Sequence, residues 1–378
     1  MKTYLCNATL ISDGVVKKNQ GVVVENGVII TLTDRCPDDA KMVDLGGDYL
    51  VPTFVDLHCH GGFGFEFVDA TEEAVLEACK IHAAHGTGVL YPTVSASDYD
   101  TTYKTLETIE AVKDQMPLFI PGVHLEGPYL SPLMCGAQDP GIIRKPNEEE
   151  YRRLYERFGN LIARWDYAPE EDDDGKFLDF LNKKGITPST AHSAAKYDDL
   201  LPAFEKGNRL VTHLYSCTST ITREGGFRKL GIVETTFLLK DMYAEVIGDG
   251  CHLPAELMAM VFTVKGADRL CLVTDAIRFA GLPSEDGAVW NVGNVTYLVE
   301  DGVAKLSDRS AFAGSIATTD TLLQRTVKAG IPFPDVVKML TETPARVMGL
   351  KNYGKIAVGY RAAFNRITPD LAVTPLVY

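Results

Sequence analysis

Residues 51–62 have the sequence VPTFVDLHCHGG. The apolar, β-branched run predicts a buried strand, and it ends in two histidines spaced two residues apart. Because side chains alternate along a strand, His58 and His60 should point to one face and Cys59 to the other. Two imidazoles on one face, followed by glycines that let the chain turn away, favour a metal site. Two hydrogen-bonded core histidines are the alternative.

Strand, loop and helix patterns alternate from residue 50 to residue 275. After the first strand, the apolar runs predict strands at 89–94, 118–128, 162–170, 185–192, 210–213, 243–250 and 270–275. Helices are expected near 71–85, 98–114 and 175–184, the first of them capped by Thr71. Eight strands that alternate with helices are typical of a (β/α)8 TIM-type barrel.

The two ends of the chain have a different pattern. Residues 1–49 contain short strand candidates broken by turns, with Asn26-Gly27 between two β-branched runs as a hairpin signal. Another hairpin is expected at 295–306, with helices near 318–329 and 333–342. The tail from Gly354 is strand-like again. Chain termini often lie close together, so we expect residues 1–49 plus 354–378 to form a small β-sandwich domain beside a barrel of residues 50–353.

Metal-binding side chains stand at the ends of several predicted strands. In such a barrel the active site lies at the carboxyl ends of the strands. Nitrogen and carboxylate ligands suit zinc, and also iron, manganese or cobalt. The residues at these positions are His58, His60, Glu126, His192, His213, His252 and Asp275.

Composition excludes several classes of partner. The net charge of −14 argues against nucleic acid and anionic membranes. No apolar stretch has the length of a membrane span, and the N-terminus lacks the pattern of a signal sequence. The eight cysteines include no CxxC pair, so we expect reduced thiols and a cytoplasmic protein.

The order of these motifs resembles the amidohydrolase superfamily. Within it, five segments are similar to the N-acetylglucosamine-6-phosphate deacetylases. These segments are HLEGPY at 124–129, THLY at 212–215, DGCH at 249–252, LVTDA at 272–276 and AGS at 313–315.

The resemblance implies a role for each residue. Glu126, His192 and His213 match the main metal ligands, and His58 and His60 match a second-metal pair that some members have, so one or two divalent metals are expected. The other matches are Asp275 to the general acid/base, His252 to a substrate-contacting histidine, and Arg223 to an arginine that reaches the substrate phosphate from the neighbouring subunit of a homodimer.

The chain departs from the family pattern in three places. Gln138 stands where the family usually has a histidine, in GAH or GTH. Ser216 and Cys217 replace the usual Asn-Ala, in a segment that helps hold the phosphate. An acidic residue near the C-terminus is replaced around residues 362–364. The first two changes concern contacts to the sugar and its phosphate.

The sequence therefore predicts a metal-dependent deacetylase of an N-acetylated amino sugar, with N-acetylglucosamine 6-phosphate as the first candidate substrate. The galactosamine epimer and a sugar without phosphate are alternatives. A hydrolase of cyclic amides, or a deaminase, is disfavoured because many of those enzymes carry a carboxylated lysine on the fourth strand, and residues 165–167 contain none. A metal-binding scaffold protein without catalytic turnover is disfavoured, because Asp275, which matches the general acid/base residue, is present. The alternative role for Asp275 itself is that of a metal ligand that transfers no proton.

Overall fold

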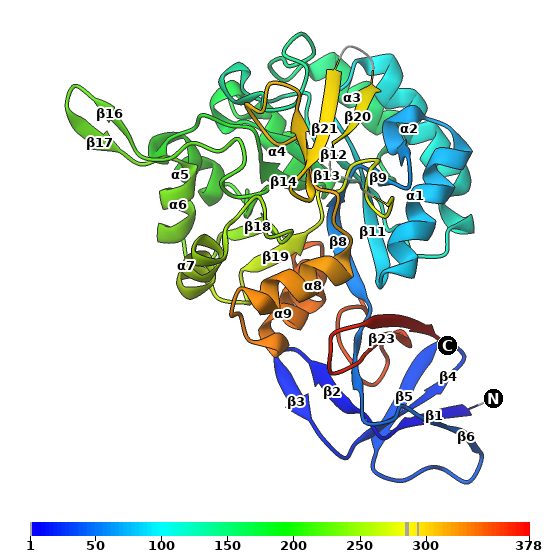
Figure 1. The fold of residues 1–378 in the computed structure, drawn as a ribbon. Coiled ribbons are helices and arrows are strands. Elements are labelled where there is room, and N and C mark those ends of the chain that lie inside the picture. The colour runs from blue at the N-terminus through cyan, green and yellow to red at the C-terminus, as the bar shows by residue number, and fades with distance from the viewer. Residues whose placement is uncertain (1, 284–286, 293–294) are drawn as a thin grey trace.

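A computed structural model of the chain describes residues 2–283, 287–292 and 295–378. Its centre is one sheet of eight parallel strands, in the order β19-β18-β15-β14-β13-β12-β11-β8 (Figure 1). The strands are β8 (Phe54–Cys59), β11 (Thr87–Val94), β12 (Val123–Leu125), β13 (Ile162–Tyr167), β14 (Thr187–Thr190), β15 (Leu210–Val211), β18 (Tyr243–Ile247) and β19 (Leu270–Val273).

The sheet curves round until its two edge strands meet. The N–H of Asp275, just after β19, donates to the carbonyl of His58 on β8 (2.9 Å), and the N–H of His60 donates to the carbonyl of Ala276 (2.8 Å). The predicted (β/α)8 barrel is thus confirmed. These closing bonds lie at the carboxyl ends of the strands, where the polar residues gather.

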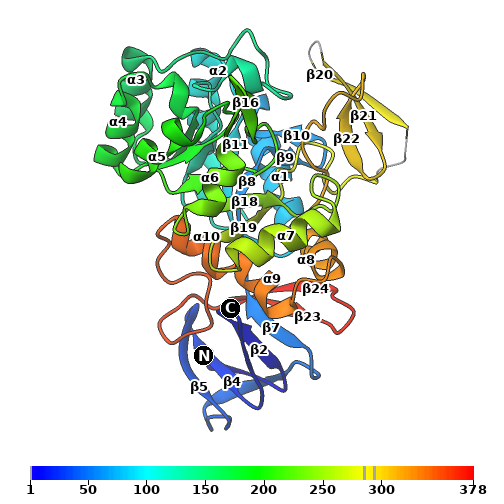
Figure 2. The ribbon, with the colours of Figure 1, turned by 90° about the vertical axis from the view of Figure 1, so that its left-hand side faces the viewer.

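Helices surround the barrel (Figures 1 and 2). They are α1 (Glu72–Ala84), α2 (Tyr99–Val112), α3 (Glu148–Phe158), α4 (Lys176–Lys184), α5 (Tyr197–Glu205), α6 (Ile232–Leu238), α7 (Ala255–Lys265), α8 (Thr319–Lys328), α9 (Phe333–Leu340) and α10 (Glu342–Val347). The predicted cap is confirmed, because the Thr71 hydroxyl accepts from Ala74 N–H at 3.2 Å and two acids follow in the first turn. No helix in the described ranges is long and apolar enough to cross a membrane.

Apolar side chains between strands and helices hold the barrel together. Trp165 of β13 and Phe177 of α4 are fully buried and meet edge to face at 5.3 Å. Replacing such an aromatic side chain by Ala typically costs about 3–5 kcal/mol. Trp165 also reaches the site, because its Nε1–H donates to the carbonyl of Gly127 (2.8 Å) and so fixes the chain directly after Glu126.

Two further sheets, at the bottom of Figure 1, come from the ends of the chain. One has the order β5-β4-β1-β6 and the other β24-β23-β7-β2-β3, and they share a buried core that includes Leu5, Leu50 and Phe364. Their strands are β1 (Lys2–Cys6), β2 (Thr9–Ser12), β3 (Val15–Lys17), β4 (Gly21–Glu25), β5 (Val28–Thr33), β6 (Ala40–Asp44), β7 (Tyr49–Pro52), β23 (Ala363–Ile367) and β24 (Val373–Val377). The hairpin at Asn26-Gly27 is confirmed by the pair β4 and β5.

The start of the first barrel strand was predicted too early. Val51 and Pro52 lie in β7, which pairs with β23 and β2, and the barrel strand begins only at Phe54. A single run of apolar residues therefore serves two sheets in succession. The first half of the run pairs with residues 363–367, which are more than 300 residues away in the sequence.

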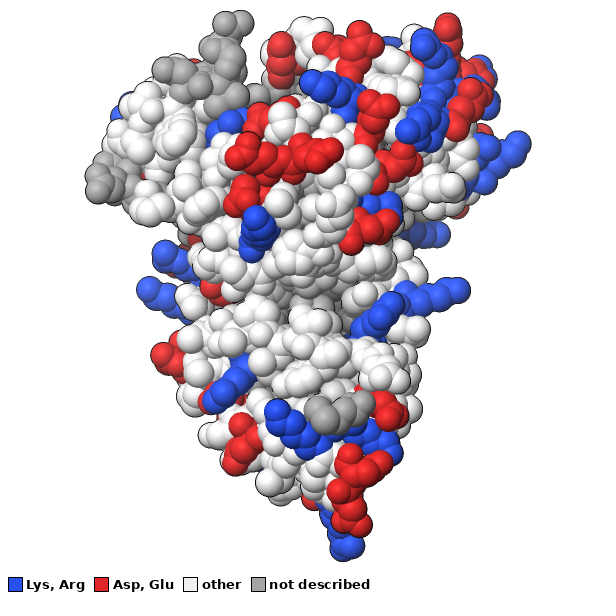
Figure 3. All heavy atoms as spheres, turned by 90° about the vertical axis from the view of Figure 1, so that its right-hand side faces the viewer, with Lys and Arg blue, Asp and Glu red and all other residues white. Residues whose placement is uncertain are grey.

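Smaller sheets border the barrel. The expected hairpin at 295–306 is confirmed as β21 (Val295–Glu300) and β22 (Val303–Leu306), and β20 (Ala288–Val292) adds a third strand (Figure 2). β9 (Gly61–Gly62) and β10 (Phe65–Glu66) form a short pair after His60. Acidic and basic side chains are mixed over the barrel half of the face shown in Figure 3. The described residues of this face therefore form no continuous basic surface to which a polyanion such as nucleic acid could bind.

Candidate metal centre

Six of the predicted site residues converge inside the carboxyl end of the barrel. They lie at or just after the ends of five different strands, and each is at most 9% exposed. These residues are His58 at the end of β8, His60 after it, Glu126 after β12, His192 after β14, His213 after β15 and Asp275 after β19.

Glu126 forms the centre of one half of the group. Its Oε1 lies 3.0 Å from Nε2 of His213 and 3.1 Å from Nε2 of His192. Its Oε2 lies 3.3 Å from Nε2 of His60, and Oε1 lies 3.6 Å from Nε2 of His58. This one carboxylate therefore faces all four imidazoles.

Asp275 joins the other half. Its Oδ1 is 3.2 Å from Nε2 of His60 and 3.4 Å from Nε2 of His58, and the two Nε2 atoms are 3.1 Å apart. The predicted common orientation of His58 and His60 is thus confirmed. Two sets of ligand atoms lie within 4.8 Å of one another, namely those of His58, Glu126 and His213 and those of His58, His60 and Asp275.

The outer nitrogen of each of these four imidazoles has a partner of its own. A ring nitrogen that faces a carbonyl must carry the proton, which leaves Nε2 with a free lone pair in the neutral ring. The Nδ1 partners are Glu245 Oε2 for His58 (3.4 Å), Ser95 Oγ for His60 (2.9 Å), the Met134 carbonyl for His192 (2.9 Å) and the Ser216 carbonyl for His213 (3.1 Å). All four rings therefore present Nε2 to the same space.

Backbone conformation helps to aim these side chains. His192, His213 and Asp275 have φ angles of 41°, 28° and 46°, in the left-handed region that residues other than glycine rarely adopt. Each such residue costs on the order of 1 kcal/mol or more. Strain of this kind gathers at functional sites, where the surrounding structure holds it in place.

The charges at the site fit a bound cation. Burial raises the pKa of Glu126, but the facing histidines lower it well below its ordinary value. Burial lowers the pKa of His60, but Asp275 and Glu126 raise it to about 10. Two buried carboxylates thus draw positive charge into the space between the Nε2 atoms. Four imidazoles and two carboxylates are a donor set that suits a divalent metal such as zinc.

The predicted substrate residues have different environments. His252 follows β18 in the loop at the carboxyl end of the barrel, and its Nδ1 is 2.8 Å from Asp249 Oδ2. Gln138 donates from Nε2 to Glu126 Oε2 (2.8 Å), and its Oε1 accepts from the N–H of Ala96 (3.1 Å). Both polar atoms of Gln138 are therefore engaged within the chain.

Ser216 and Cys217 follow His213 in the chain. Ser216 contributes the carbonyl that accepts from His213. The Cys217 thiol interacts with His192. Burial raises the pKa of Cys217, but the interaction with His192 lowers that pKa below its ordinary value. Arg223 is exposed on the hairpin of β16 (Thr222–Glu224) and β17 (Phe227–Lys229), which projects from the barrel in Figure 1.

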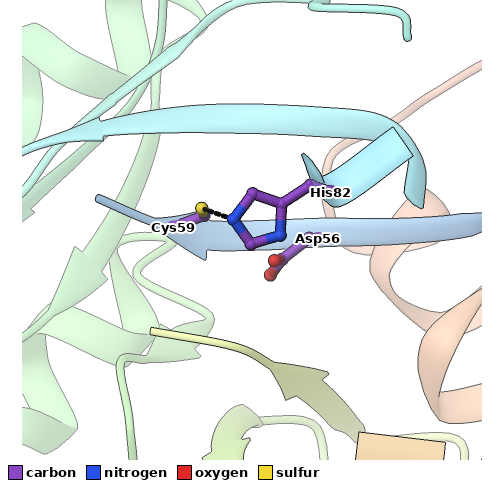
Figure 4. A group of neighbouring side chains, drawn as sticks. All are labelled: Asp56, Cys59 and His82. Atoms are coloured by element: carbon purple, nitrogen blue, oxygen red, sulfur yellow. Dashed lines mark hydrogen bonds between the residues drawn. The ribbon is translucent and has the colours of Figure 1, made fainter. Parts of the chain in front are cut away.

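A third group of metal-competent side chains, Asp56, Cys59 and His82, lies within 4.8 Å (Figure 4). Hydrogen bonds within the barrel hold these three side chains. His82 Nε2 lies 2.9 Å from the Gly61 carbonyl and 3.1 Å from Cys59 Sγ, while Nδ1 of the same ring is buried without a hydrogen-bond partner among the described residues. Burial raises the pKa of Cys59 well above its usual range and lowers that of His82 to about 4. Asp56 accepts from the hydroxyl and the N–H of Thr274 (2.6 and 3.2 Å).

Sequence analysis missed a buried ionic layer beneath the centre. Arg164 and Asp166 of β13 and Glu245 of β18 are fully buried inside the barrel. The signal was available, because charged residues within predicted barrel strands are rarely buried unless paired. Only the closed barrel shows with which strand each of them pairs.

Comparison with known proteins agrees with this architecture. Residues 49–376 match the sequence profile described as the Amidohydrolase family. The chain belongs to the amidohydrolase family. An N-acetylglucosamine-6-phosphate deacetylase of Haemophilus influenzae is 29% identical over 377 residues, which cover 99% of this chain and 97% of that protein.

Other members of the amidohydrolase family extend this likeness. An N-acetylgalactosamine-6-phosphate deacetylase of Shewanella sp. is 28% identical, covering 97% of this chain and 92% of that protein. The crystal structure of N-acetylglucosamine-6-phosphate deacetylase from Pasteurella multocida superposes with a TM-score of 0.91 at 27% identity, covering 100% of this chain and 98% of that chain. The resemblance to the amino sugar phosphate deacetylases is thus confirmed over nearly the whole chain.

Proposed function

We propose that this amidohydrolase removes the acetyl group of N-acetylglucosamine 6-phosphate, giving glucosamine 6-phosphate and acetate. The observation that carries the proposal is the convergence of four imidazole Nε2 atoms on Glu126 and Asp275. The full-length relatives with this activity in their names supply the substrate class.

The metal ligands follow from the donor set. Glu126, His192 and His213 would hold one divalent metal, and His58 and His60 a second, with Glu126 between them. Zinc is the first candidate, with iron, manganese or cobalt as alternatives. A bound metal of this kind polarises an amide carbonyl and lowers the pKa of water toward about 7.

Asp275 moves the proton in this proposal. Burial raises the pKa of its carboxyl, but the neighbouring histidines lower it below its ordinary value, so the group is ionised at neutral pH. It takes a proton from the attacking water and delivers it to the amide nitrogen as the C–N bond breaks, because an amine leaves poorly unless it is protonated. His252, oriented by Asp249, contacts the substrate.

The phosphate would be recognised by Arg223 across a homodimer. The arginine is exposed on a hairpin that projects away from its own barrel, as a side chain that reaches into a neighbouring subunit must be. Gln138, Ser216 and Cys217 would border the sugar and phosphate. The eight free cysteines support a cytoplasmic location, where thiols stay reduced.

Acetate release tests the proposal, on protein whose metal content has been counted. The substrates are N-acetylglucosamine 6-phosphate, its galactosamine epimer and unphosphorylated N-acetylglucosamine. We expect the highest kcat/KM with the first. A preference for the epimer would assign the second activity that relatives carry in their names. A preference for the unphosphorylated sugar would contradict the role of Arg223, and no release from any of the three would refute the deacetylase proposal.

A further inference from the structure

Arg164 lies fully buried inside the barrel, and nothing in the proposed chemistry uses it. All three of its nitrogens donate hydrogen bonds. Nε donates to Ser189 Oγ (2.9 Å) and Asp166 Oδ1 (3.2 Å), Nη1 to the Leu57 carbonyl (3.3 Å) and to Glu245 Oε1, and Nη2 to Thr212 Oγ1 (2.7 Å) and Glu245 Oε2 (3.1 Å). The guanidinium thus holds Glu245 in a two-pronged ion pair of fixed geometry.

Glu245 connects this ion pair to the metal centre. It is fully buried on β18, and the same Oε2 that accepts from Arg164 lies 3.4 Å from Nδ1 of His58. On the far side of the ring, Nε2 of His58 faces Asp275 and Glu126. The guanidinium thus contacts the carboxylate, the carboxylate contacts the imidazole, and the imidazole faces the candidate metal site. In this arrangement a carboxylate orients a metal-binding histidine.

His58 differs in this respect from the other three histidines of the centre. Their Nδ1 atoms meet neutral partners, which are a hydroxyl and two backbone carbonyls. His58 alone among the four is backed by a carboxylate. A negatively charged hydrogen-bond acceptor at Nδ1 makes the Nε2 lone pair more basic, and so a stronger metal ligand.

Stability alone does not explain this buried pair. Taking an arginine and a carboxylate out of water costs several kcal/mol per ion, and well-packed apolar residues of similar volume are often as stable or more so. Apolar branched residues are the usual filling of such a barrel. A role beyond packing is therefore the economical explanation.

We propose that Glu245, held by Arg164, is a positioning residue that fixes His58 as the Nδ1–H tautomer and so directs Nε2 to a metal. The inference rests on the proposed metal centre but not on the identity of the sugar. Glu245 touches neither the substrate nor the reacting atoms.

The deciding variant is Glu245→Gln, which keeps the shape of the side chain. The amide is neutral, so His58 loses its negatively charged acceptor in either orientation of the side chain, and the amide nitrogen donates and cannot accept. With the amide nitrogen at Nδ1, the imidazole must carry its proton on Nε2, and His58 can no longer bind a metal in that form. Asp166→Asn is the matched control, because it removes a carboxylate of the same buried layer that faces Arg164 and His124 but not His58.

The readout is metal affinity, measured by competition with a chromogenic chelator, together with metal equivalents per chain and melting temperature. Loss of such an outer partner typically weakens metal binding by about 10–100-fold. We expect that loss in one equivalent for Glu245→Gln and unchanged affinity for Asp166→Asn, although both lower the melting temperature. The proposal would be overturned if both variants lost the same metal affinity, or if Glu245→Gln lost none. The same criterion applies if the wild type binds only one metal equivalent.

A measurement on the wild type keeps the test open if Glu245→Gln does not fold. The chain is labelled with 15N-histidine, and the His58 ring is assigned by comparison with His58→Gln. The proposal requires the Nδ1–H tautomer at His58, and a signal from the Nε2–H tautomer would refute it. Failure of the deacetylase proposal is distinct, because it would show as absent acetate release from a wild type that binds metal normally.

Discussion

Replacing Asp275 by Asn removes a negative charge from the centre while leaving the size of the side chain almost unchanged. The backbone should tolerate the change, since Asn accepts a left-handed φ such as the observed 46° more readily than most residues. The backbone N–H still donates to the His58 carbonyl (2.9 Å), and the carbonyl still accepts from Ser315 N–H (2.8 Å). We therefore expect a folded variant.

The expected loss of activity follows from the proton role. Asp275 is 9% exposed, and its Oδ1 lies 3.2 and 3.4 Å from two imidazoles, so no bulk water takes over as a base at that position. An amide does not accept a proton at neutral pH. A general acid–base group contributes about 10²–10⁴-fold to the rate, which corresponds to about 2.7–5.4 kcal/mol of activation free energy. We predict that kcat falls by this factor in Asp275→Asn.

The assay measures acetate release at saturating substrate and metal content on the same sample. Asp100→Asn, at an exposed position of α2, serves as the control for loss of a carboxylate far from the chemistry. A kcat close to that of the wild type at equal metal content would refute the proton role. Activity that falls only in proportion to lost metal would show that Asp275 acts as a metal ligand alone.

Three other predictions concern the phosphate, the metal and the packing of the helices. Arg223→Gln should raise KM for the phosphorylated sugar by about tenfold, as expected for loss of a charge-assisted hydrogen bond, and leave the unphosphorylated sugar unaffected. Arg228→Gln, its neighbour across the hairpin, is the matched control, and equal effects would contradict a specific contact. Chelation should lower the melting temperature, because metal held at about 100 times its Kd stabilises the fold by about 2.7 kcal/mol; calorimetry before and after zinc is restored measures this, and an unchanged midpoint counts against a bound metal. His85 Nδ1 lies 2.8 Å from Asp320 Oδ2, and Asp320 raises the pKa of His85, so the stability from this pair is present below about pH 6.5 and is lost as the pH rises through the folded pKa. His85→Gln should therefore lower the melting temperature more at pH 6 than at pH 9, and the same decrease at both would contradict the assignment.

Local spacing was enough to predict how several side chains of the candidate metal centre are oriented. The pattern His58-Cys59-His60 specifies two imidazoles on one face, because the period of a strand is two residues whatever the rest of the chain does. Metal-competent residues at the ends of successive apolar runs predicted convergence, because parallel strands in a barrel end at one face. The hairpin at Asn26-Gly27 was equally local, since its turn needs residues that accept positive φ.

Pairings between distant segments were decided only by the tertiary structure. Val51 and Pro52 have the composition of a barrel strand, but their partner at residues 363–367 places them in the smaller sheet. Gln138 turned inward to Glu126, a contact that depends on how a long loop folds back over the site.

The buried ion pair of Arg164 and Glu245 is the clearest case. Both residues are visible in the sequence as charges within predicted strands, but β13 and β18 are separated in the sheet by β14 and β15, and their side chains meet only across the closed barrel. The sequence by itself determined the strands, their order along the chain and the faces on which the metal-competent side chains lie, because these depend on local periodicity. Which charges neutralise one another depends on distances across the barrel, and these exist only after the sheet has closed.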